Sequence, residues 1–253
     1  MDRRADQAAV IEPPITARDL RVKVFADGAD LEAIRELAAD PAIQGFTTNP
    51  TLMRKAGVTD YEEFAREALK LVGDRPISFE VFTDDFAEMA REARILAKLG
   101  GGVYVKIPVT DTLGNSSGEL VSELSSEGIK LNVTGLFTQS QVETISNALA
   151  TDTPACISLF AGRIADAGID PVPLVAEAVR SIADKPRQEL IWASPREILN
   201  LVQADEVGCH IITVTHDLLK KLPLLGTDLT EFSLDTVRMF NRDALTAGYR
   251  LGV

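Results

Sequence analysis

A lysine stands in the middle of the stretch VYVKIPVT, where apolar and polar residues alternate from Val103 to Thr110. The alternation places four apolar side chains on one face of a predicted strand and Lys106 on the opposite face. A lysine that is withdrawn from water disfavours its charged form, and a neutral amine can attack a carbonyl carbon to give a Schiff base. The protonated imine then draws electrons from an adjacent carbon–carbon bond as that bond breaks. Lys106 is therefore the first candidate catalytic residue.

Schiff-base chemistry also needs groups that move protons, and two carboxylates follow the same rule of alternation. Asp27 shares a face with Phe25 in the run RVKVFADG, and Glu80 shares a face with Ser78 in PISFEVF. Either carboxylate can act as a general acid or base on substrate hydroxyl groups. The alternative is that Lys106 only forms a structural ion pair with one of them, because a buried charge requires a partner.

Other polar side chains take the same inward face on the remaining predicted strands, which favours a reaction site over a structural ion pair. The rule of alternation predicts inward positions for Thr47, Asn49, Asn132, Thr134, Ser158 and Ser194, together with the aromatic residues Phe160 and Trp192. In the seventh strand it sends Trp192 and Ser194 inward against Ile191 and Ala193. Such polar groups have no structural reason to gather in a packed core, so we expect them to line a substrate pocket.

Three anion donors lie at or just after the ends of the sixth and seventh apolar runs. Arg163 lies in FAGRI, and Ser194 and Arg196 lie in WASPREI, at the start of a predicted helix. Barrels often bind phosphate at late βα loops, where arginines hold the oxygens bidentately and a helix N-terminus adds its dipole. Together with the lysine these donors suggest a phosphorylated sugar. The alternative is that both arginines form surface ion pairs.

The elements that must position these residues repeat one theme, a short apolar run followed by helical periodicity. The runs are residues 21–28, 45–50, 76–82, 103–109, 130–137, 155–162, 189–194 and 210–215. The predicted helices are residues 30–40, 61–72, 85–100, 116–128, 138–150, 170–183, 194–205 and 215–222. Eight β-then-α units in about 250 residues predict an α/β fold, a (β/α)8 TIM barrel. An open doubly wound sheet is the alternative, but no run is followed by a GxGxxG phosphate turn.

Two segments lie outside the eight units. Residues 1–20 precede the first strand as an N-terminal extension, and residues 229–253 follow the last unit. Within the latter, residues 229–249 have the periodicity of an amphipathic helix. Because no low-complexity linker separates these segments from the barrel, we expect a single domain over residues 1–253.

The composition limits the classes of partner and compartment. A net charge of −12, with 38 acidic and 26 basic residues, argues against a nucleic-acid binder and against a protein of anionic membranes. Cys156 and Cys209 lie in separate apolar runs without metal-ligand spacing, so we expect buried free thiols and no metal site. The sequence contains no apolar segment of ~18 to 20 residues and no secretory signal at its start, which makes the reducing cytoplasm the expected compartment.

Three motifs resemble those of the transaldolases: KIPVT in the fourth strand, TTNP after Phe46, and ISLFAGRI in the sixth run. The resemblance extends over roughly residues 20 to 225 in the same order and spacing. It implies a (β/α)8 barrel, Lys106 as the Schiff-base nucleophile, no metal or organic cofactor, and sugar phosphates as small-molecule partners. We also expect a homo-oligomer.

The resemblance also implies a role for each candidate site residue. Asp27 is similar to the acid/base near the C3 and C4 hydroxyls, and Glu80 to the carboxylate that works through a water held by Thr134. Five residues of this chain are similar to the family's substrate-binding groups: Thr47, Asn49, Asn132, Ser158 and Phe160. Three of them, Asn49, Asn132 and Ser158, are similar to the groups that hold the dihydroxyacetone end. The family's phosphate-binding groups are matched by Arg163, Ser194 and Arg196.

The same family contains fructose 6-phosphate aldolases, which tend to have glutamine, a hydrophobic residue and tyrosine where this chain has Glu80, Asn132 and Phe160. These positions favour transfer of a dihydroxyacetone unit from sedoheptulose 7-phosphate or fructose 6-phosphate to glyceraldehyde 3-phosphate or erythrose 4-phosphate, in the pentose phosphate pathway. Two alternatives stay open: an aldolase that releases dihydroxyacetone, and a non-catalytic barrel that binds sugar phosphates.

Overall fold

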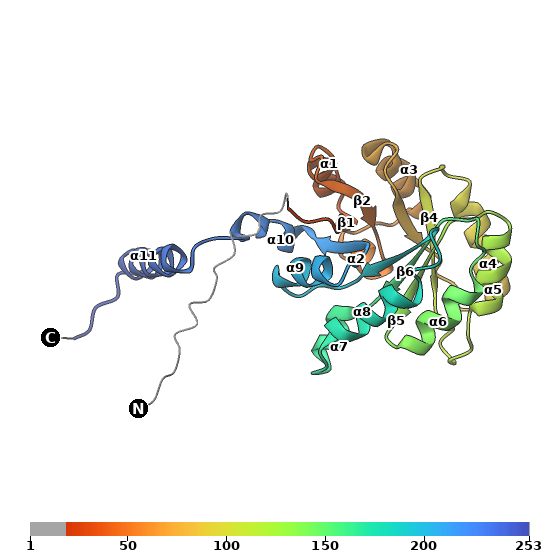
Figure 1. Cartoon of the computed structure of the whole chain (residues 1–253). Coiled ribbons are helices and arrows are strands. Elements are labelled where there is room, and N and C mark those ends of the chain that lie inside the picture. Colours follow the sequence, from red (N-terminus) through yellow and green to blue (C-terminus); the bar gives the residue numbers. More distant parts are fainter. Residues whose placement is uncertain (1–18, 253) are drawn as a thin grey trace, which may run out of the picture. The chain divides into compact units, whose positions relative to one another are not determined.

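The computed structural model describes residues 19–252 of the chain (Figure 1). These residues belong to two compact units, one of which is Arg21–Lys220, while the segment that begins at Lys221 belongs to the other. The expected N-terminal extension, residues 1–20, lies almost wholly outside the described residues. The expectation of one domain over the whole chain stays a prediction.

Eight parallel strands close into a barrel in the first unit, and this confirms the predicted (β/α)8 fold. The strands are β1 (Lys23–Asp27), β2 (Ile43–Thr47), β3 (Ile77–Glu80), β4 (Val103–Pro108), β5 (Leu131–Leu136), β6 (Ala155–Leu159), β7 (Gln188–Trp192) and β8 (Ile211–Thr215). Each strand pairs with the next along the chain, and β8 pairs with β1. Each predicted apolar run supplies one strand, although β2 and β7 begin before their runs, at Ile43 and Gln188.

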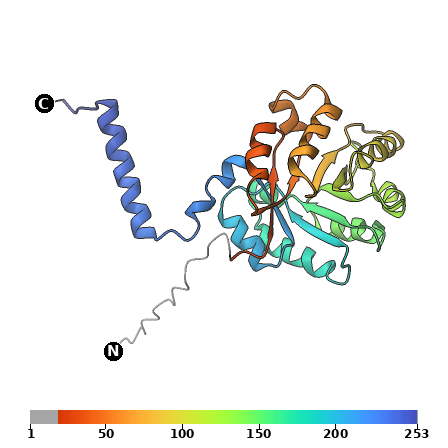
Figure 2. The same cartoon turned by 90° about the horizontal axis from the view of Figure 1, so that it is seen from above.

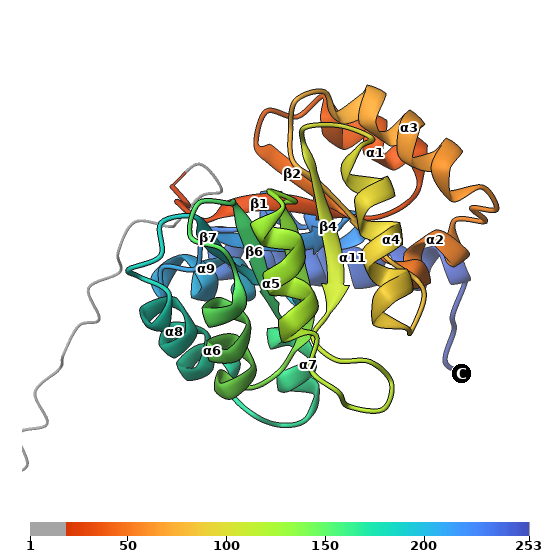
Figure 3. The ribbon, with the colours of Figure 1, turned by 90° about the vertical axis from the view of Figure 1, so that its right-hand side faces the viewer.

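Ten helices of this unit lie around the outside of the strands (Figures 2 and 3). They are α1 (Leu31–Ala38), α2 (Pro50–Lys55), α3 (Tyr61–Val72), α4 (Phe86–Ala97), α5 (Gly118–Ser126), α6 (Gln139–Ala148), α7 (Ala161–Asp166), α8 (Pro171–Ser181), α9 (Leu199–Glu206) and α10 (His216–Leu219). The expected caps are present: Asp30 accepts from the N–H of Ala33, and Thr138 forms a capping box with Gln141. The short helices α2 and α7 were not predicted, because six residues are too few to show helical periodicity.

Alternation along β4 separates the two faces as expected. Val103, Val105 and Ile107 are at most 3% exposed on the side of the helices. On the other side, Tyr104 packs against a buried cluster of Phe25, Cys156, Ile191 and Ile211. This cluster lies in the N-terminal half of the barrel interior, below the polar groups of the C-terminal half.

A glycine in β2 makes room for this cluster. Gly45 is the lateral partner of Phe25, and a Cβ atom on Gly45 would lie 2.5 Å from Cζ of the Phe25 ring. The aromatic ring therefore occupies the space in which any other residue at position 45 would place its side chain.

The predicted orientation of the seventh strand is wrong. Ile191 belongs to the interior cluster and is the lateral partner of Ser158 and Ile211. Trp192 pairs instead with Leu159 and Ile212, and is fully buried on the helix side. The run LIWA is apolar at successive positions, as strands buried on both faces are, and alternation then carries no information about which face points inward.

The predicted helix 194–205 begins later than expected, at Leu199. The residues before it form a turn in which Ser194 has φ of +58°, and Ser194 is the only non-glycine residue with positive φ in the part of the chain that the structure describes. This turn, rather than strand alternation, sets the direction of the Ser194 side chain.

The second unit contains a short 3₁₀ helix, η1 (Leu222–Leu224), and the long helix α11 (Leu229–Ala247). Asp228 caps the start of α11, and Gly248 ends it in the left-handed conformation with φ of 66°. The helix expected at residues 229–249 is thus confirmed. Among residues 19–252, no helix is both long and apolar enough to cross a membrane.

Candidate active site

A pocket of about 590 Å³ opens at the C-terminal ends of the strands, and all the predicted site residues line it. They are Asp27, Thr47, Asn49, Glu80, Lys106, Asn132, Thr134, Ser158, Phe160, Arg163, Ser194 and Arg196. The rule of alternation missed Thr213 and Thr215 of β8, which line the pocket as well. In the run HIITVT both threonines lie on the same face of the strand, which could have indicated an inward direction. Because two isoleucines stand at successive positions before them, however, the sequence did not show which face points inward.

Lys106 is buried in β4, with 6% of its surface exposed. Its Nζ atom donates to the carbonyl oxygen of Thr48 at 2.9 Å and lies 3.1 Å from Oε2 of Glu80. Glu80 is its lateral partner on β3, so the strand register brings the two side chains together. An ammonium group has three N–H donors, and two of these directions are taken by Thr48 and Glu80. The amine therefore keeps a donor for the pocket that it lines.

Asp27 is the last residue of β1 and lines the same pocket as Lys106. Thr47 Oγ1 donates to Asp27 Oδ1 at 2.8 Å and is also hydrogen-bonded to Thr213 Oγ1. Burial raises the pKa of Asp27, while the charge of Lys106 and the hydrogen bond from Thr47 oppose that rise and Glu80 adds to it. A carboxyl group with a raised pKa exchanges protons with a substrate hydroxyl more readily than an ordinary aspartate, as a general acid/base requires.

A buried chain of three residues joins β3, β5 and β6. Asn132 Nδ2 donates to Ser78 Oγ at 3.0 Å, and Ser158 Oγ donates to Asn132 Oδ1 at 2.7 Å. These two bonds hold the Asn132 amide in one orientation beside its lateral partner Lys106. The neighbouring Thr134 Oγ1 is buried without a hydrogen-bond partner among the described residues, so it can hold a water or a substrate hydroxyl.

Asn49 has a structural contact that the sequence did not reveal. It is the N-cap of α2, and its Oδ1 accepts from the backbone N–H of Leu52 at 3.0 Å. The cap fixes the side chain at the pocket wall and leaves its Nδ2 group to donate.

The two arginines come from different elements at the pocket's rim. Arg163 lies in α7, with its guanidinium carbon 5.1 Å from the centre of the Phe160 ring. Arg196 lies before α9, and its Nε donates to Oδ1 of Asp166 at 3.0 Å. The surface ion pair considered from the sequence therefore exists for Arg196, although both of its partners stay about half exposed. Exposed pairs of this kind are weak and exchange readily for a phosphate.

Close packing between α7 and the turn after β7 brings these arginines together. Gly162 N donates to the carbonyl of Ala193 at 3.2 Å, and a Cβ on Gly162 would lie 1.4 Å from the carbonyl oxygen of Ser194. Only glycine permits this approach. The same contact accompanies the left-handed conformation of Ser194, a backbone state that in non-glycine residues often marks functional sites.

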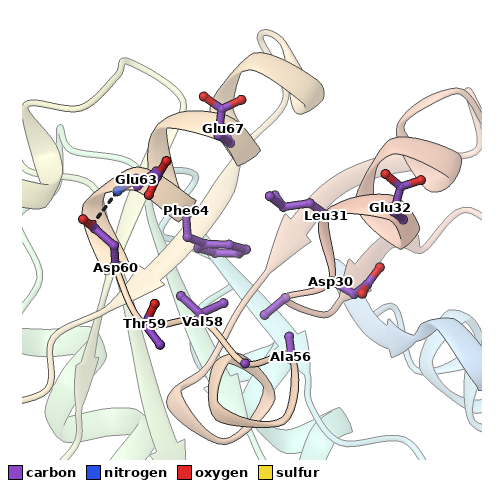
Figure 4. A pocket seen from close by; sticks show the side chains of 12 residues that line it. Asp30, Leu31, Glu32, Ala56, Val58, Thr59, Asp60, Glu63, Phe64 and Glu67 are labelled. Carbon is purple, nitrogen blue, oxygen red and sulfur yellow. Dashed lines mark hydrogen bonds between the residues drawn. The ribbon is translucent and has the colours of Figure 1, made fainter.

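A second hollow of about 390 Å³ lies between the start of α1 and the start of α3 and contains none of the predicted site residues. Figure 4 shows Val58 and Phe64 at its centre with carboxylates around them, and its acidic lining residues are Asp30, Glu32, Asp60, Glu63 and Glu67. No lysine or arginine lines it. Its charge is therefore unsuited to a phosphorylated ligand.

Both cysteines are buried free thiols, as expected from the sequence. Burial raises the pKa of Cys209 to about 12 and that of Cys156 still further. Neither thiol is thus poised to act as a nucleophile. Among residues 19–252, no group of three or more His, Cys, Asp or Glu side chains is placed to hold a metal ion.

Comparison with known proteins places this site in a family. The family model described as transaldolase/fructose-6-phosphate aldolase matches residues 24–250. A probable transaldolase of Clostridium acetobutylicum is 38% identical over 226 residues, which cover 87% of this chain and 100% of that protein. A probable transaldolase of Methanococcus maripaludis is 36% identical over 225 residues, covering 87% of this chain and 100% of that protein. A third, from a Chelativorans species, is 39% identical over 220 residues, covering 85% of this chain and 96% of that protein.

Among solved structures, 2,3-dimethylmalate lyase matches with a TM-score of 0.52 at 11% identity, over 94% of this chain and 90% of that one. This second comparison shows the barrel fold alone. The family model, by contrast, matches residues 24–250, a range that includes every residue lining the pocket. The chain belongs to the transaldolase/fructose-6-phosphate aldolase family.

Proposed function

We propose that this protein is a transaldolase, which moves a dihydroxyacetone unit from a ketose phosphate to an aldose phosphate through a Schiff base on Lys106. The single observation that carries the proposal is the buried pair of Lys106 and Glu80, 3.1 Å apart, in one pocket with Asp27. An amine beside two carboxylates is the set of groups that Schiff-base cleavage of a carbon–carbon bond requires.

The first half of the reaction forms the Schiff base. Lys106 gives up a proton to Glu80 and its Nζ attacks the C2 carbonyl of the ketose, which produces a carbinolamine. Glu80 returns the proton to the C2 hydroxyl, which leaves as water, and a water held by Thr134 relays protons between these groups. The iminium ion that results is the electron acceptor for the next step.

Cleavage follows at the bond between C3 and C4. Asp27 takes the proton of the C4 hydroxyl, the aldose phosphate leaves as an aldehyde, and the bonding electrons move to the iminium nitrogen. The enamine that remains on Lys106 attacks the carbonyl carbon of an acceptor aldose, Asp27 returns its proton to the new hydroxyl, and water hydrolyses the iminium. Asn49, Asn132 and Ser158 hold the dihydroxyacetone hydroxyls during both halves, with Thr47 and Phe160 completing the walls.

Transfer, rather than release of free dihydroxyacetone, is supported by the residues around the enamine. Release requires an acid that protonates the enamine carbon, and Phe160 has no hydroxyl with which to do so. Arg163, Ser194 and Arg196 all line the pocket, and these groups hold the phosphate of donor and acceptor at its rim. The proposed donors are sedoheptulose 7-phosphate and fructose 6-phosphate, and the acceptors glyceraldehyde 3-phosphate and erythrose 4-phosphate, which places the reaction in the pentose phosphate pathway.

A trapping experiment tests this function. The protein is incubated with fructose 6-phosphate and borohydride, digested, and searched by mass spectrometry for a reduced dihydroxyacetone adduct. We expect the adduct on Lys106 in the native chain, and none in Lys106→Met. The matched control is Lys23→Met, because Lys23 also forms an ion pair inside the barrel, with Glu189 at 2.6 Å, but at the opposite end from Lys106.

The outcomes separate the candidate functions. If the native chain forms no adduct, both enzymatic functions, transaldolase and aldolase, are rejected. The candidate that then remains is a non-catalytic barrel that binds sugar phosphates. An adduct, followed by cleavage at the same rate with and without an acceptor aldehyde, assigns the aldolase activity that the family name also contains. Cleavage that depends on the acceptor supports transfer. We further propose a cytoplasmic homo-oligomer, and the mass of the protein in solution tests the assembly.

A further inference from the structure

We propose that Thr213 of β8 is a positioning residue for Asp27, acting through the hydroxyl of Thr47. This inference rests on the proposed function, in which Asp27 accepts the proton of the C4 hydroxyl as a carboxylate. It concerns a residue that neither the motifs nor the family resemblance singled out.

The hydrogen bonds fix the direction of the chain. Thr47 Oγ1 donates to Asp27 Oδ1 at 2.8 Å and is also within hydrogen-bond distance of Thr213 Oγ1. A hydroxyl group has one proton to donate. Because that of Thr47 is committed to the carboxylate, Thr213 must donate to Thr47. The chain therefore runs from Thr213 through Thr47 to Asp27, and all three residues line the pocket.

The chain also spans the strand that carries Asp27. Thr47 lies on β2 and Thr213 on β8, and β1 pairs with β2 on one side and with β8 on the other. The contact between the two threonines thus links strands that are not neighbours in the barrel. The contact thus connects β2 and β8, the two strands that flank β1, at the bottom of the pocket. Both threonines are buried there, with Thr47 3% and Thr213 7% exposed.

A purely structural role would not need a hydroxyl at position 213. Valine has nearly the shape of threonine, and both Ile211, which lies below Thr213 in the interior, and Phe25, its lateral partner on β1, are apolar. A buried hydroxyl without a partner is unfavourable, so a threonine here is stabilised only through its bond to Thr47. The hydrogen bond from Thr213 to Thr47 has a function if Thr47 must direct its own proton to the Asp27 carboxylate.

The charges around Asp27 set the direction of the effect. Lys106 on β4 and the hydrogen bond from Thr47 on β2 favour the carboxylate, whereas burial and Glu80 on β3 oppose it; from β8 come the uncharged Thr213 and Thr215. Loss of the Thr213 donor weakens the bond from Thr47 to Asp27, because the hydrogen bonds in a chain polarise and strengthen one another. The pKa of Asp27 then rises further, and a smaller fraction of the protein carries the carboxylate in weakly acidic solution.

Kinetic pH profiles test the inference with three variants. In Thr213→Val we expect the acidic limb of the kcat/KM profile to move to higher pH. On that limb kcat/KM should fall about threefold to tenfold, which corresponds to the net free energy of one ordinary hydrogen bond. Thr213→Ser keeps the donor and should restore the native profile. Thr153→Val is the matched control, because Thr153 is 8% exposed and donates to the Ser125 carbonyl far from the pocket. It should change stability without moving the limb.

Carbon-13 NMR titration of the aspartate carboxyls reads the same effect without any substrate, with Asp27→Asn identifying the Asp27 signal. The Asp27 signal should titrate at higher pH in Thr213→Val than in the native chain. Identical titrations, or a rate reduced by one factor at all pH values, overturn the positioning role even if transfer is intact. If instead trapping on Lys106 fails, the proposed function is overturned while the titration still decides the role of Thr213.

Discussion

Nζ of Lys106 lies 3.1 Å from Oε2 of Glu80, and the two residues are lateral partners on the neighbouring strands β4 and β3. Their distance is therefore set by the register of two strands rather than by a loop, and rigid elements hold catalytic groups more accurately than loops do. The side chains are 8% and 18% exposed, so the pair forms part of the pocket wall. A carboxylate at this distance can exchange protons with the amine without moving.

Replacement of Glu80 by glutamine tests its proton transfer. Glu80→Gln keeps the shape of the side chain but cannot accept the amine's proton, so we expect kcat for transfer to fall by roughly 10²- to 10⁴-fold with a much smaller change in KM. The measurement is steady-state transfer from fructose 6-phosphate to erythrose 4-phosphate. Glu189→Gln is the control, since Glu189 pairs with Lys23 at the other end of the barrel. Transfer at the native rate in Glu80→Gln would exclude this role.

Asp27→Asn should lose activity and gain stability. Burial raises the pKa of Asp27 in the folded chain above the ordinary value of 3.8, so the stability that the protonated form contributes is present below that value. It is lost as the pH rises through the folded-state pKa. The native chain is therefore weakened by Asp27 at neutral pH, and an uncharged asparagine removes this cost.

Thermal unfolding at two pH values checks the sign. We expect the Tm of Asp27→Asn to exceed the native Tm by more at pH 7.5 than at pH 4.5, while transfer falls by roughly 10²- to 10⁴-fold. An Asp27→Asn variant that is less stable than the native chain at pH 7.5 would show that Asp27 stabilises the fold.

Gly162→Ala should disrupt the proposed phosphate site by displacing its backbone. Its Cβ would lie 1.4 Å from the carbonyl oxygen of Ser194, so the turn that carries Ser194 and Arg196 must move. We expect a rise in KM for phosphorylated sugars of roughly tenfold or more, as for the loss of one charge-assisted hydrogen bond, and a loss of about 1 to 3 kcal/mol in stability. At Gly101 an added Cβ meets nothing within 4 Å, so Gly101→Ala serves as the control. An unchanged KM in Gly162→Ala would separate this turn from phosphate binding.

Phe160→Tyr tests the proposal that the protein transfers the dihydroxyacetone unit rather than releasing it. The Phe160 ring lines the pocket just after β6 and contacts Phe137 and Arg163, so a tyrosine there would add an acid near the proposed enamine. We expect release of dihydroxyacetone in the absence of an acceptor to rise by about tenfold or more, which an enzymatic assay of free dihydroxyacetone measures. Phe137→Tyr, on the neighbouring exposed ring, is the matched control. Equal release from the native chain and Phe160→Tyr would place the control of release elsewhere.

The fold and most of the pocket could be predicted because several strands alternate clearly. In β4 the valines and Ile107 define the helix side, so Lys106 can only point inward, and the same holds for Asp27, Glu80 and Asn132. In β7 and β8 apolar residues stand at adjacent positions, so alternation does not show which face points inward. For this reason Trp192 was wrongly predicted to point inward, and Thr213 was not predicted to line the pocket. The structural contacts of Asn49 and Gly162 depend on short helices that have no periodicity to detect.

The amino-acid sequence by itself determined the eight-unit barrel, the inward direction of Lys106, and the identity of the groups at the C-terminal strand ends. Such features follow from hydrophobic periodicity, which is local and needs no knowledge of partners. Only the tertiary structure decided that Thr47 and Thr213 meet across β1, that Ser194 adopts a left-handed turn against Gly162, and that Arg196 pairs with Asp166. These contacts join residues far apart in the chain, and they exist only because closure of the barrel brings β8 next to β1 and packs α7 against the turn after β7.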